Sequence, residues 1–133
     1  MQNAPPLEAA LATRLIGERV IGALIAQVRS EAQLRQALAQ RVLAGNKATI
    51  PNEGLFLWLQ LPIQWDASEF AGRLRQEGVL VVPGKAFTID GELVVNAVRI
   101  ATGAVKTVAE LEIALQRVQS LLNQNSSLLS SID

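Results

Sequence analysis

Arg99 lies within an otherwise apolar run that is typical of a β-strand, Leu93-Val-Val-Asn-Ala-Val-Arg-Ile-Ala-Thr102. Strict alternation along a strand would place its side chain on the same face as two small neighbours, Ala97 and Ala101. Because a guanidinium is always charged, burying it costs free energy unless an anion pairs with it. Two interpretations follow: the side chain reaches water or a structural carboxylate, or it forms a fork that binds the carboxylate of a small ligand.

The composition of the chain narrows the classes of function. Twelve basic and twelve acidic residues cancel, so there is no excess of positive charge to attract nucleic acid. Cysteine and histidine are absent, which excludes disulfides, thiolate catalysis and histidine general bases. Half of the 133 residues are hydrophobic, which is enough for the core of one domain. No stretch resembles a membrane span or a signal peptide, so we expect a cytoplasmic protein that binds neither membrane nor nucleic acid directly.

Residues 1–45 are predicted to form an N-terminal helical segment. Leucine, isoleucine and valine recur three to five residues apart over residues 7–28. Ser30-Glu-Ala-Gln33 could open a second helix, although one continuous helix fits the periodicity as well. Gly45-Asn46 is expected to end the helical region. The apolar stripe of residues 7–28 either packs on the chain's own sheet or pairs with a second copy, which would make a homo-oligomer.

Two capping boxes lie in the middle and towards the end of the chain. Asp66-Ala-Ser-Glu69 and Thr107-Val-Ala-Glu110 each carry an acceptor side chain three residues before a glutamate. They predict helices over residues 67–77 and 107–122. The sequence then changes to asparagine, serine and leucine, and residues 124–133 are expected to form a flexible tail.

Two short apolar runs predict neighbouring strands. Residues 55–61 are apolar on both faces, which favours a central strand, and Phe56 and Trp58 are most simply assigned to the core. Residues 79–82 predict a second, buried strand that stops at Pro83-Gly84.

A turn signal at Ile89-Asp-Gly-Glu92 predicts a hairpin of residues 86–89 and 92–101. Within it, Asn96 would fall on the face opposite Arg99, where it is expected to tie down the hairpin. The whole pattern predicts an α+β fold for residues 46–123. In this two-layer sandwich, helices cover one face of a small, mostly antiparallel sheet, and the long helical segment precedes it.

The order of these motifs resembles the C-terminal small domain of class I/II aminotransferases, the pyridoxal-phosphate enzymes of fold type I. It is especially similar to the aminotransferase-like half of MocR-type regulators in the GntR group. The resemblance extends from about Gly54 to Leu122. It is carried by Asn52-Glu-Gly-Leu-Phe-Leu-Trp-Leu-Gln-Leu-Pro62, Glu77-Gly-Val-Leu-Val-Val-Pro-Gly-Lys-Ala-Phe87 and Asn96-Ala-Val-Arg-Ile-Ala101.

The resemblance implies roles for particular residues. In that family, the arginine that matches Arg99 holds the α-carboxylate of the amino-acid substrate. Gly54 matches a glycine at which the backbone approaches the substrate, so its amide is a second candidate for carboxylate binding. Glu53 replaces the first of the two glycines that the family commonly has here, and a carboxylate at this position would compete for Arg99. Lys85 is not the Schiff-base lysine by this resemblance.

The resemblance also implies that the cofactor site lies elsewhere. In fold type I enzymes the Schiff-base lysine and the phosphate-binding loop belong to a large domain that precedes this segment. We therefore expect no cofactor in this chain, pyridoxal phosphate in its full-length parent, and no transamination by this chain alone. An amino acid or other carboxylate would bind between this domain and the large one.

Three functions stay open at this point. The chain could be part of an aminotransferase, with Arg99 as the carboxylate anchor. It could instead be the effector or oligomerisation domain of a MocR/GntR-type regulator, or a structural module that binds no ligand. The sequence does not distinguish an enzyme parent from a regulator, nor does it identify the substrate.

Overall fold

The computed structural model describes the backbone of residues 6–84, 87–89 and 91–132, and the side chains of residues 6–84 and 91–124. The chain divides into two compact units, one ending at Glu31 and one beginning at Ala32. The first unit consists of helix, and the second contains the sheet and the hydrophobic core. Among the described residues, no helix is both long and apolar enough to cross a membrane.

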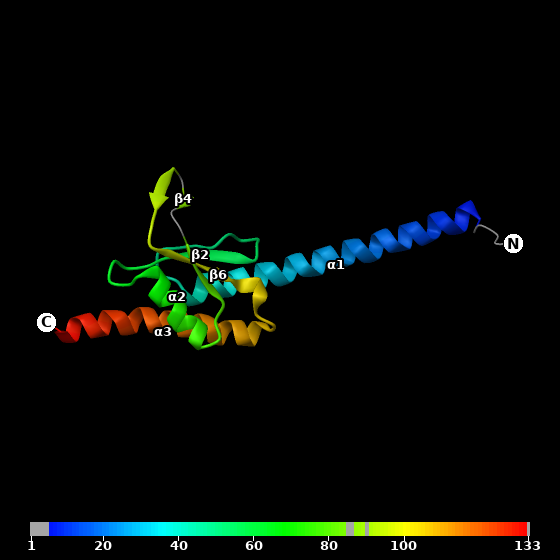
Figure 1. Ribbon diagram of the computed structural model, residues 1–133. Helices are drawn as coiled ribbons and strands as arrows, with labels where there is room; N and C mark the ends of the chain where they lie inside the picture. Colours follow the sequence, from blue (N-terminus) through cyan, green and yellow to red (C-terminus); the bar gives the residue numbers. More distant parts are fainter. Residues whose placement is uncertain (1–5, 85–86, 90, 133) are drawn as a thin grey trace. The chain divides into compact units, whose positions relative to one another are not determined.

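Helix α1 runs from Leu7 to Val42 without interruption (Figure 1). Ser30 therefore does not open a second helix, because good helix formers continue on both sides of it. The helical region ends just before Gly45, whose φ of +89° a glycine adopts at little steric cost. The predicted end at Gly45-Asn46 is confirmed.

The apolar stripe of residues 7–28 is exposed on the surface of α1. At least 51 % of the surface of each of its large apolar residues is accessible. An exposed patch of this kind is typical of an interaction surface. The homo-oligomer nevertheless stays a prediction. The residues concerned are Leu7, Leu11, Leu15, Ile16, Val20, Ile21, Leu24, Ile25 and Val28.

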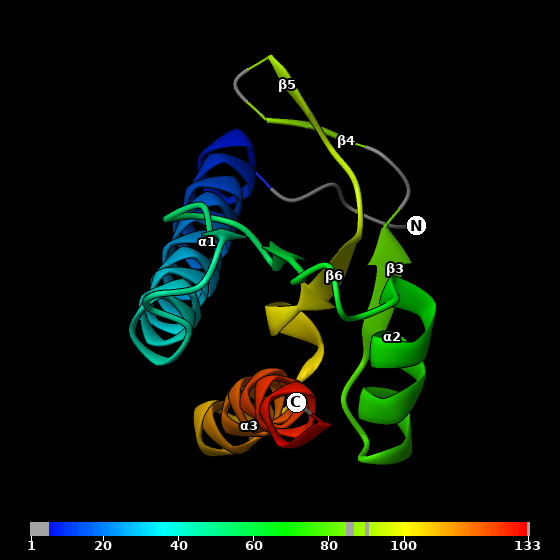
Figure 2. The same cartoon turned by 90° about the vertical axis from the view of Figure 1, so that its left-hand side faces the viewer.

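A four-stranded antiparallel sheet forms the centre of the second unit. Its strands lie in the order β1 (Ala48–Thr49), β2 (Phe56–Gln60), β6 (Ala97–Ala101) and β3 (Val81–Gly84). Figure 2 shows β6 beside β3, with α2 next to β3 and α3 below β6. The prediction of a central strand at residues 55–61 is confirmed, because β2 pairs with β1 on one side and β6 on the other.

Strand β3 corrects one expectation. Pro83-Gly84 was expected to stop the strand, but both residues belong to β3 and pair with β6, Pro83 opposite Val98 and Gly84 opposite Ala97. The reason is that β3 lies at the edge of the sheet. Proline is tolerated there because its missing N–H is not needed by a further strand.

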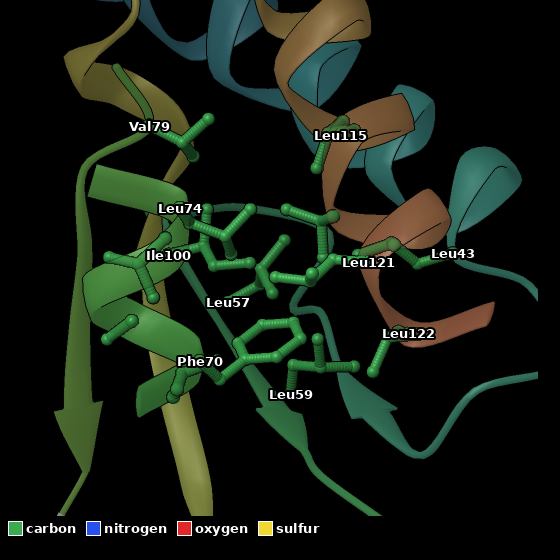
Figure 3. Packing of buried hydrophobic residues seen from close by; sticks show 14 of the residues in the cluster. Leu43, Leu57, Leu59, Phe70, Leu74, Val79, Ile100, Leu115, Leu121 and Leu122 are labelled. Atoms are coloured by element: carbon green, nitrogen blue, oxygen red, sulfur yellow. The ribbon is translucent and has the colours of Figure 1, made fainter. Parts of the chain in front are cut away.

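One face of the sheet is covered by helices and holds the core. Helices α2 (Ala67–Gln76) and α3 (Val108–Ile132) pack on this face together with the C-terminal end of α1. Alternate residues of the strands, such as Leu57, Leu59 and Ile100, point into the cluster, as Figure 3 shows. The predicted α+β class and the two-layer arrangement are confirmed.

The predicted capping boxes begin both helices. The amide of Glu69 donates to the Asp66 carboxylate at 3.1 Å, and the amide of Glu110 donates to the Thr107 hydroxyl at 3.1 Å. The backbone of α3 continues to Ile132, beyond the expected end at residue 122. The division into residues 1–45, 46–123 and a flexible tail stays a prediction.

The hairpin forms, but as a separate small sheet. β4 (Phe87–Ile89) pairs with β5 (Glu92–Val94), whereas β6 belongs to the main sheet. The expected unbroken strand over residues 92–101 is wrong, because Asn96 adopts a φ of 59° and interrupts it. Its side-chain amide donates to the carbonyls of Pro62 and Trp65 at 3.2 and 2.8 Å. Asn96 thus fixes the start of β6 to the loop after β2.

Candidate functional site

Arg99 lies in the middle of β6 on the open face of the sheet, opposite the helices. It pairs with Trp58 of β2 on one side and Val82 of β3 on the other. Residues that are directly opposite in a sheet share a face, so these three side chains project together. Val82 is 43 % exposed, and Arg99 is partly buried. The side chain is therefore neither in bulk water nor in the core.

An aromatic ring supports the Arg99 guanidinium. Its Cζ atom lies 4.6 Å from the centroid of the Phe56 ring, which is a cation–π contact. Phe56 is itself 44 % exposed, and Trp58 is partly buried. The assignment of Phe56 and Trp58 to the core is therefore wrong. Because helices cover only one face, Leu57 fills the core and its two neighbours face the open side.

No acidic side chain holds Arg99 in the described part of the chain, and no hydrogen bond or ion pair to it occurs there. Glu53, which was expected to compete for it, accepts a hydrogen bond from the Gln33 side chain at 3.1 Å. One interpretation of Arg99 was that it reaches water or pairs with a structural carboxylate. Such a pair is not observed among these residues. Its hydrogen-bonding fork stays available to a ligand.

The position of the Trp58 ring beside Arg99 depends on a small residue in β3. A Cβ atom at Gly84 would lie 2.6 Å from Cζ3 of Trp58 and 3.2 Å from the carbonyl oxygen of Ala97. The absence of a side chain at Gly84 thus makes room for the Trp58 indole on the open face. The sequence pattern assigned this glycine to a turn. It did not predict that the glycine makes room for the Trp58 ring.

Gly54 lies in the segment that leads into β2, two residues before Phe56. Its φ is +136°, a backbone conformation that side chains other than glycine rarely adopt. The residue is exposed. Phe56 thus links the two predicted binding residues. It lies two positions after Gly54 in the chain, and its ring contacts the Arg99 guanidinium.

A buried glutamine on α1 fixes this segment. Gln36 is 0 % exposed, and its amide nitrogen donates to the carbonyls of Pro51 and Phe56, both at 3.0 Å. Its oxygen accepts from the Thr102 hydroxyl at 2.7 Å. These bonds join the Gly54 segment to the chain just after β6. No local pattern predicts these bonds, because the partners of Gln36 are 15 to 66 residues away.

Arg35 anchors the turn that follows β6. It is buried and donates to the carbonyl oxygens of Thr102, at 2.9 Å, of Val105, and of Lys106, at 3.2 Å. Three carbonyl acceptors around one guanidinium hold the path of the chain between β6 and α3. This role was also not predicted, because helical periodicity does not distinguish a buried arginine from a solvated one.

Two lysines of the described residues lie in connecting segments. Lys47 precedes β1 and Lys106 precedes α3, and both side chains are exposed. A lysine that carries pyridoxal phosphate sits in an enclosed site that activates its amine. Lys85 lies outside the described residues.

The sequence of the chain identifies its family. Residues 4–118 match the family described as aminotransferase class I and II. The chain belongs to this family. It is similar to two curated regulators of the HTH type. One is YdeF of Bacillus subtilis, uncharacterised, with 32 % identity over 118 residues, which cover 89 % of this chain and 26 % of the relative. The other is TauR of Rhodobacter capsulatus, with 35 % identity over 69 residues, which cover 49 % of this chain and 14 % of the relative.

A solved structure has the same fold. The kynurenine aminotransferase of Pyrococcus horikoshii superposes with a TM-score of 0.63 at 25 % identity, over 87 % of this chain and 29 % of that protein. This chain therefore spans only about a quarter of the length of YdeF and a similar share of this aminotransferase. The resemblance to the small domain of aminotransferases and to MocR-type regulators is confirmed.

Proposed function

We propose that this chain is the C-terminal domain of a larger aminotransferase-like protein, in which Arg99 binds the carboxylate of an amino-acid ligand. The observation that supports it is the state of Arg99, which is partly buried on the open sheet face without an acidic partner among the described residues. In the full-length parent, the family's cofactor, pyridoxal phosphate, would be held by the large domain.

The Arg99 guanidinium and its neighbours suit the binding of a carboxylate. A guanidinium donates two parallel hydrogen bonds to a carboxylate, a geometry that lysine does not reproduce. The Phe56 ring lies under this fork and limits its movement, so less rotamer entropy is lost on binding. The backbone amide of Gly54, an exposed residue in the segment that leads into β2, is a further candidate donor.

The curated relatives favour a regulator as the parent. Both YdeF and TauR are HTH-type transcriptional regulators, and the match to YdeF includes most of this chain. In such a protein the aminotransferase-like half would respond to a ligand and reposition a DNA-binding domain. The coding sequence upstream decides: a winged helix and a lysine-bearing domain indicate a regulator, and the lysine-bearing domain alone indicates an aminotransferase.

The carboxylate site is tested by titration of the chain with L-alanine and with acetate. The arginine Nε–H resonances are followed by NMR, and the Arg99 signal is assigned from its loss in Arg99→Lys. We expect a saturable shift of that signal with a dissociation constant in the range of about 1–100 mM, because only half of the pocket is present. Sodium chloride at equal ionic strength separates specific binding from screening.

Two substitutions make the result specific. Arg99→Lys keeps the charge and removes the fork, so it should weaken binding at least about threefold. Arg41→Lys is the matched control, because Arg41 is exposed at the end of α1 and should leave the dissociation constant unchanged. If alanine and acetate shift the signal only as sodium chloride does, the carboxylate role is wrong and the ligand-free structural module is supported.

A further inference from the structure

Gln36 contacts the adjacent ends of the two strands that carry the proposed carboxylate site. Its side chain is 0 % exposed, and its amide nitrogen donates to the Phe56 carbonyl at 3.0 Å. The same nitrogen lies 3.9 Å from a Cβ atom built at Gly54. Its oxygen accepts from the Thr102 hydroxyl at 2.7 Å. Because β2 begins at Phe56 and Thr102 directly follows β6, one buried side chain joins both strands.

The bond to Phe56 reaches Arg99 through the phenylalanine ring. In the sheet register Phe56 lies opposite Ala101, two residues after Arg99 on β6. Its ring centroid is 4.6 Å from the Arg99 Cζ atom. A ring takes only a few staggered positions on a fixed backbone, so the position of the Phe56 backbone determines where the ring can lie. The cation–π contact depends on this placement, because it needs the cation within about 6 Å of the ring centroid.

A second contact holds the same stretch of backbone. The Gly103 amide donates to the Leu55 carbonyl at 3.1 Å. A Cβ atom built at Gly103 would lie 3.0 Å from the Leu55 Cβ atom, so the two stretches of chain pack closely here. This bond and the pairing of β2 with β6 do not involve Gln36. We therefore expect a chain without the Gln36 amide to keep its strands paired and to lose only the fixed position of the Phe56 backbone.

We propose that Gln36 is a positioning residue of the carboxylate site. It holds the Phe56 ring against the Arg99 guanidinium and thereby sets the direction in which the fork points. Gln36 is fully buried, so it does not touch the ligand, and its effect passes through the backbone at the ends of β2 and β6. This inference rests on the proposed function of Arg99, but the geometry of the free chain tests it separately.

The Arg99 Nε–H resonance of the free chain gives the first test. Gln36→Met nearly keeps the size of the side chain and removes its amide group. The neighbouring ring shifts the Arg99 resonance, and Phe56→Leu gives its position without the ring. We expect Gln36→Met to move the resonance at least about a third of the way towards that position, because the ring is no longer held against the guanidinium. An unchanged resonance in a folded Gln36→Met chain would overturn the inference.

Titration with L-alanine gives the second test. We expect Gln36→Met to raise the dissociation constant at least about threefold, because the fork must then be ordered on binding. Leu115→Ala is the control for lost stability, since it removes a fully buried core side chain from α3 and leaves the Gln36 amide in place. Its dissociation constant should equal that of the original chain. A rise of the same size in both variants would show that lost stability lowers the affinity, and the positioning role would be wrong.

The outcomes separate this inference from the proposed function. Saturable binding by the original chain, with the same dissociation constant in Gln36→Met, would overturn the positioning role and leave the carboxylate role of Arg99 in place. If the original chain shows no saturable binding, the carboxylate role is contradicted, and the Arg99 resonance of the free chain then decides whether Gln36 orients the fork.

A milder pair of variants keeps the test decisive if Gln36→Met does not fold. Thr102→Val removes the hydroxyl that donates to Gln36, whereas Thr102→Ser keeps it. We expect Thr102→Val to move the Arg99 resonance in the same direction as Phe56→Leu does, and to raise the dissociation constant about twofold. Thr102→Ser should leave both unchanged. Equal behaviour of the two variants would overturn the inference, because the bond between Thr102 and Gln36 would then not orient the site.

Discussion

The Arg99 guanidinium combines two properties that are costly to keep together, a fixed charge and partial burial. In the described part of the chain its contact is a ring face rather than an acid. A cation–π contact stabilises the charge without consuming the donors of the fork. The arginine is thus held in place while its N–H groups stay directed at whatever lies over the open face.

We predict that Phe56→Leu weakens carboxylate binding two- to fivefold, because the cation–π contact contributes about 0.5–1 kcal/mol at an exposed site. The titration with L-alanine measures this change. Ile113→Ala is the control, since Ile113 is exposed on α3, which covers the opposite face of the sheet. Equal affinity of Phe56→Leu and the original chain would show that the ring does not orient Arg99.

The sequence predicted the candidate binding residue, Arg99, but not the side chains that surround it. Alternation placed Arg99 beside Ala97 and Ala101, and this spacing holds within β6. Phe56 and Trp58 were misassigned because a strand with large apolar residues on both faces gives no sign of which face the helices cover. The absence of an acidic partner depends on Glu53 bonding to Gln33, a contact between residues 20 apart.

Among the elements, the end of α1 does most to fix the segment that carries Gly54. Gln36 replaces water as the partner of two carbonyl groups and a hydroxyl, all from other elements. The bond to the Thr102 hydroxyl is buried, so this hydroxyl would have no water to replace the glutamine if the side chain were lost.

We predict that Gln36→Leu lowers the free energy of unfolding by about 2–4 kcal/mol, because it leaves the buried Thr102 hydroxyl without its acceptor and two partly buried carbonyl groups without a donor. Urea denaturation measures the loss. Gln40→Leu is a close control on the same helix: Gln40 also donates two bonds, to the Ile50 carbonyl and to Asn52, but it is exposed and water can replace it. If the two variants lose equal stability, burial is not what makes Gln36 important.

A second element-level prediction concerns β3. Gly84→Ala should lower the free energy of unfolding by about 1–3 kcal/mol, because the new methyl group overlaps the Trp58 ring and the Ala97 carbonyl. In Gly72→Ala the added Cβ meets nothing within 4 Å inside α2, so that variant should gain about 0.5–1 kcal/mol. Thermal unfolding distinguishes the opposite signs. A neutral Gly84→Ala would mean that Trp58 moves freely.

The capping boxes show which elements a sequence can predict. Both depend on residues three apart, and both begin helices as expected. The strand at residues 92–101 fails because the break at Asn96 comes from bonds to residues 62 and 65, more than 30 residues earlier. Local patterns thus identified the helix starts, and tertiary contacts decided where β6 begins.

For the whole molecule, the core and the exposed stripe belong to different parts of the chain. Every buried hydrophobic residue in the described part lies at or after Ala32. The two units are therefore stabilised differently. The second unit is stabilised by packing of its hydrophobic core, and the first by the hydrogen bonds of its helix.

We predict that a chain beginning at residue 31 retains the fold of the second unit, with a loss of at most about 1 kcal/mol in the free energy of unfolding, the cost of a missing helix cap. Urea denaturation and amide NMR spectra measure this. Cooperative loss of the sheet on truncation would show that the first unit contributes to the core.

The sheet's two outer strands have a consequence for how copies of this chain can meet. β1 is only two residues long, and β3 carries Pro83, which lacks the amide proton that a ladder requires. Neither border is a good template for adding a strand from another molecule. Crowding many copies together should therefore not seed cross-β fibrils through this sheet.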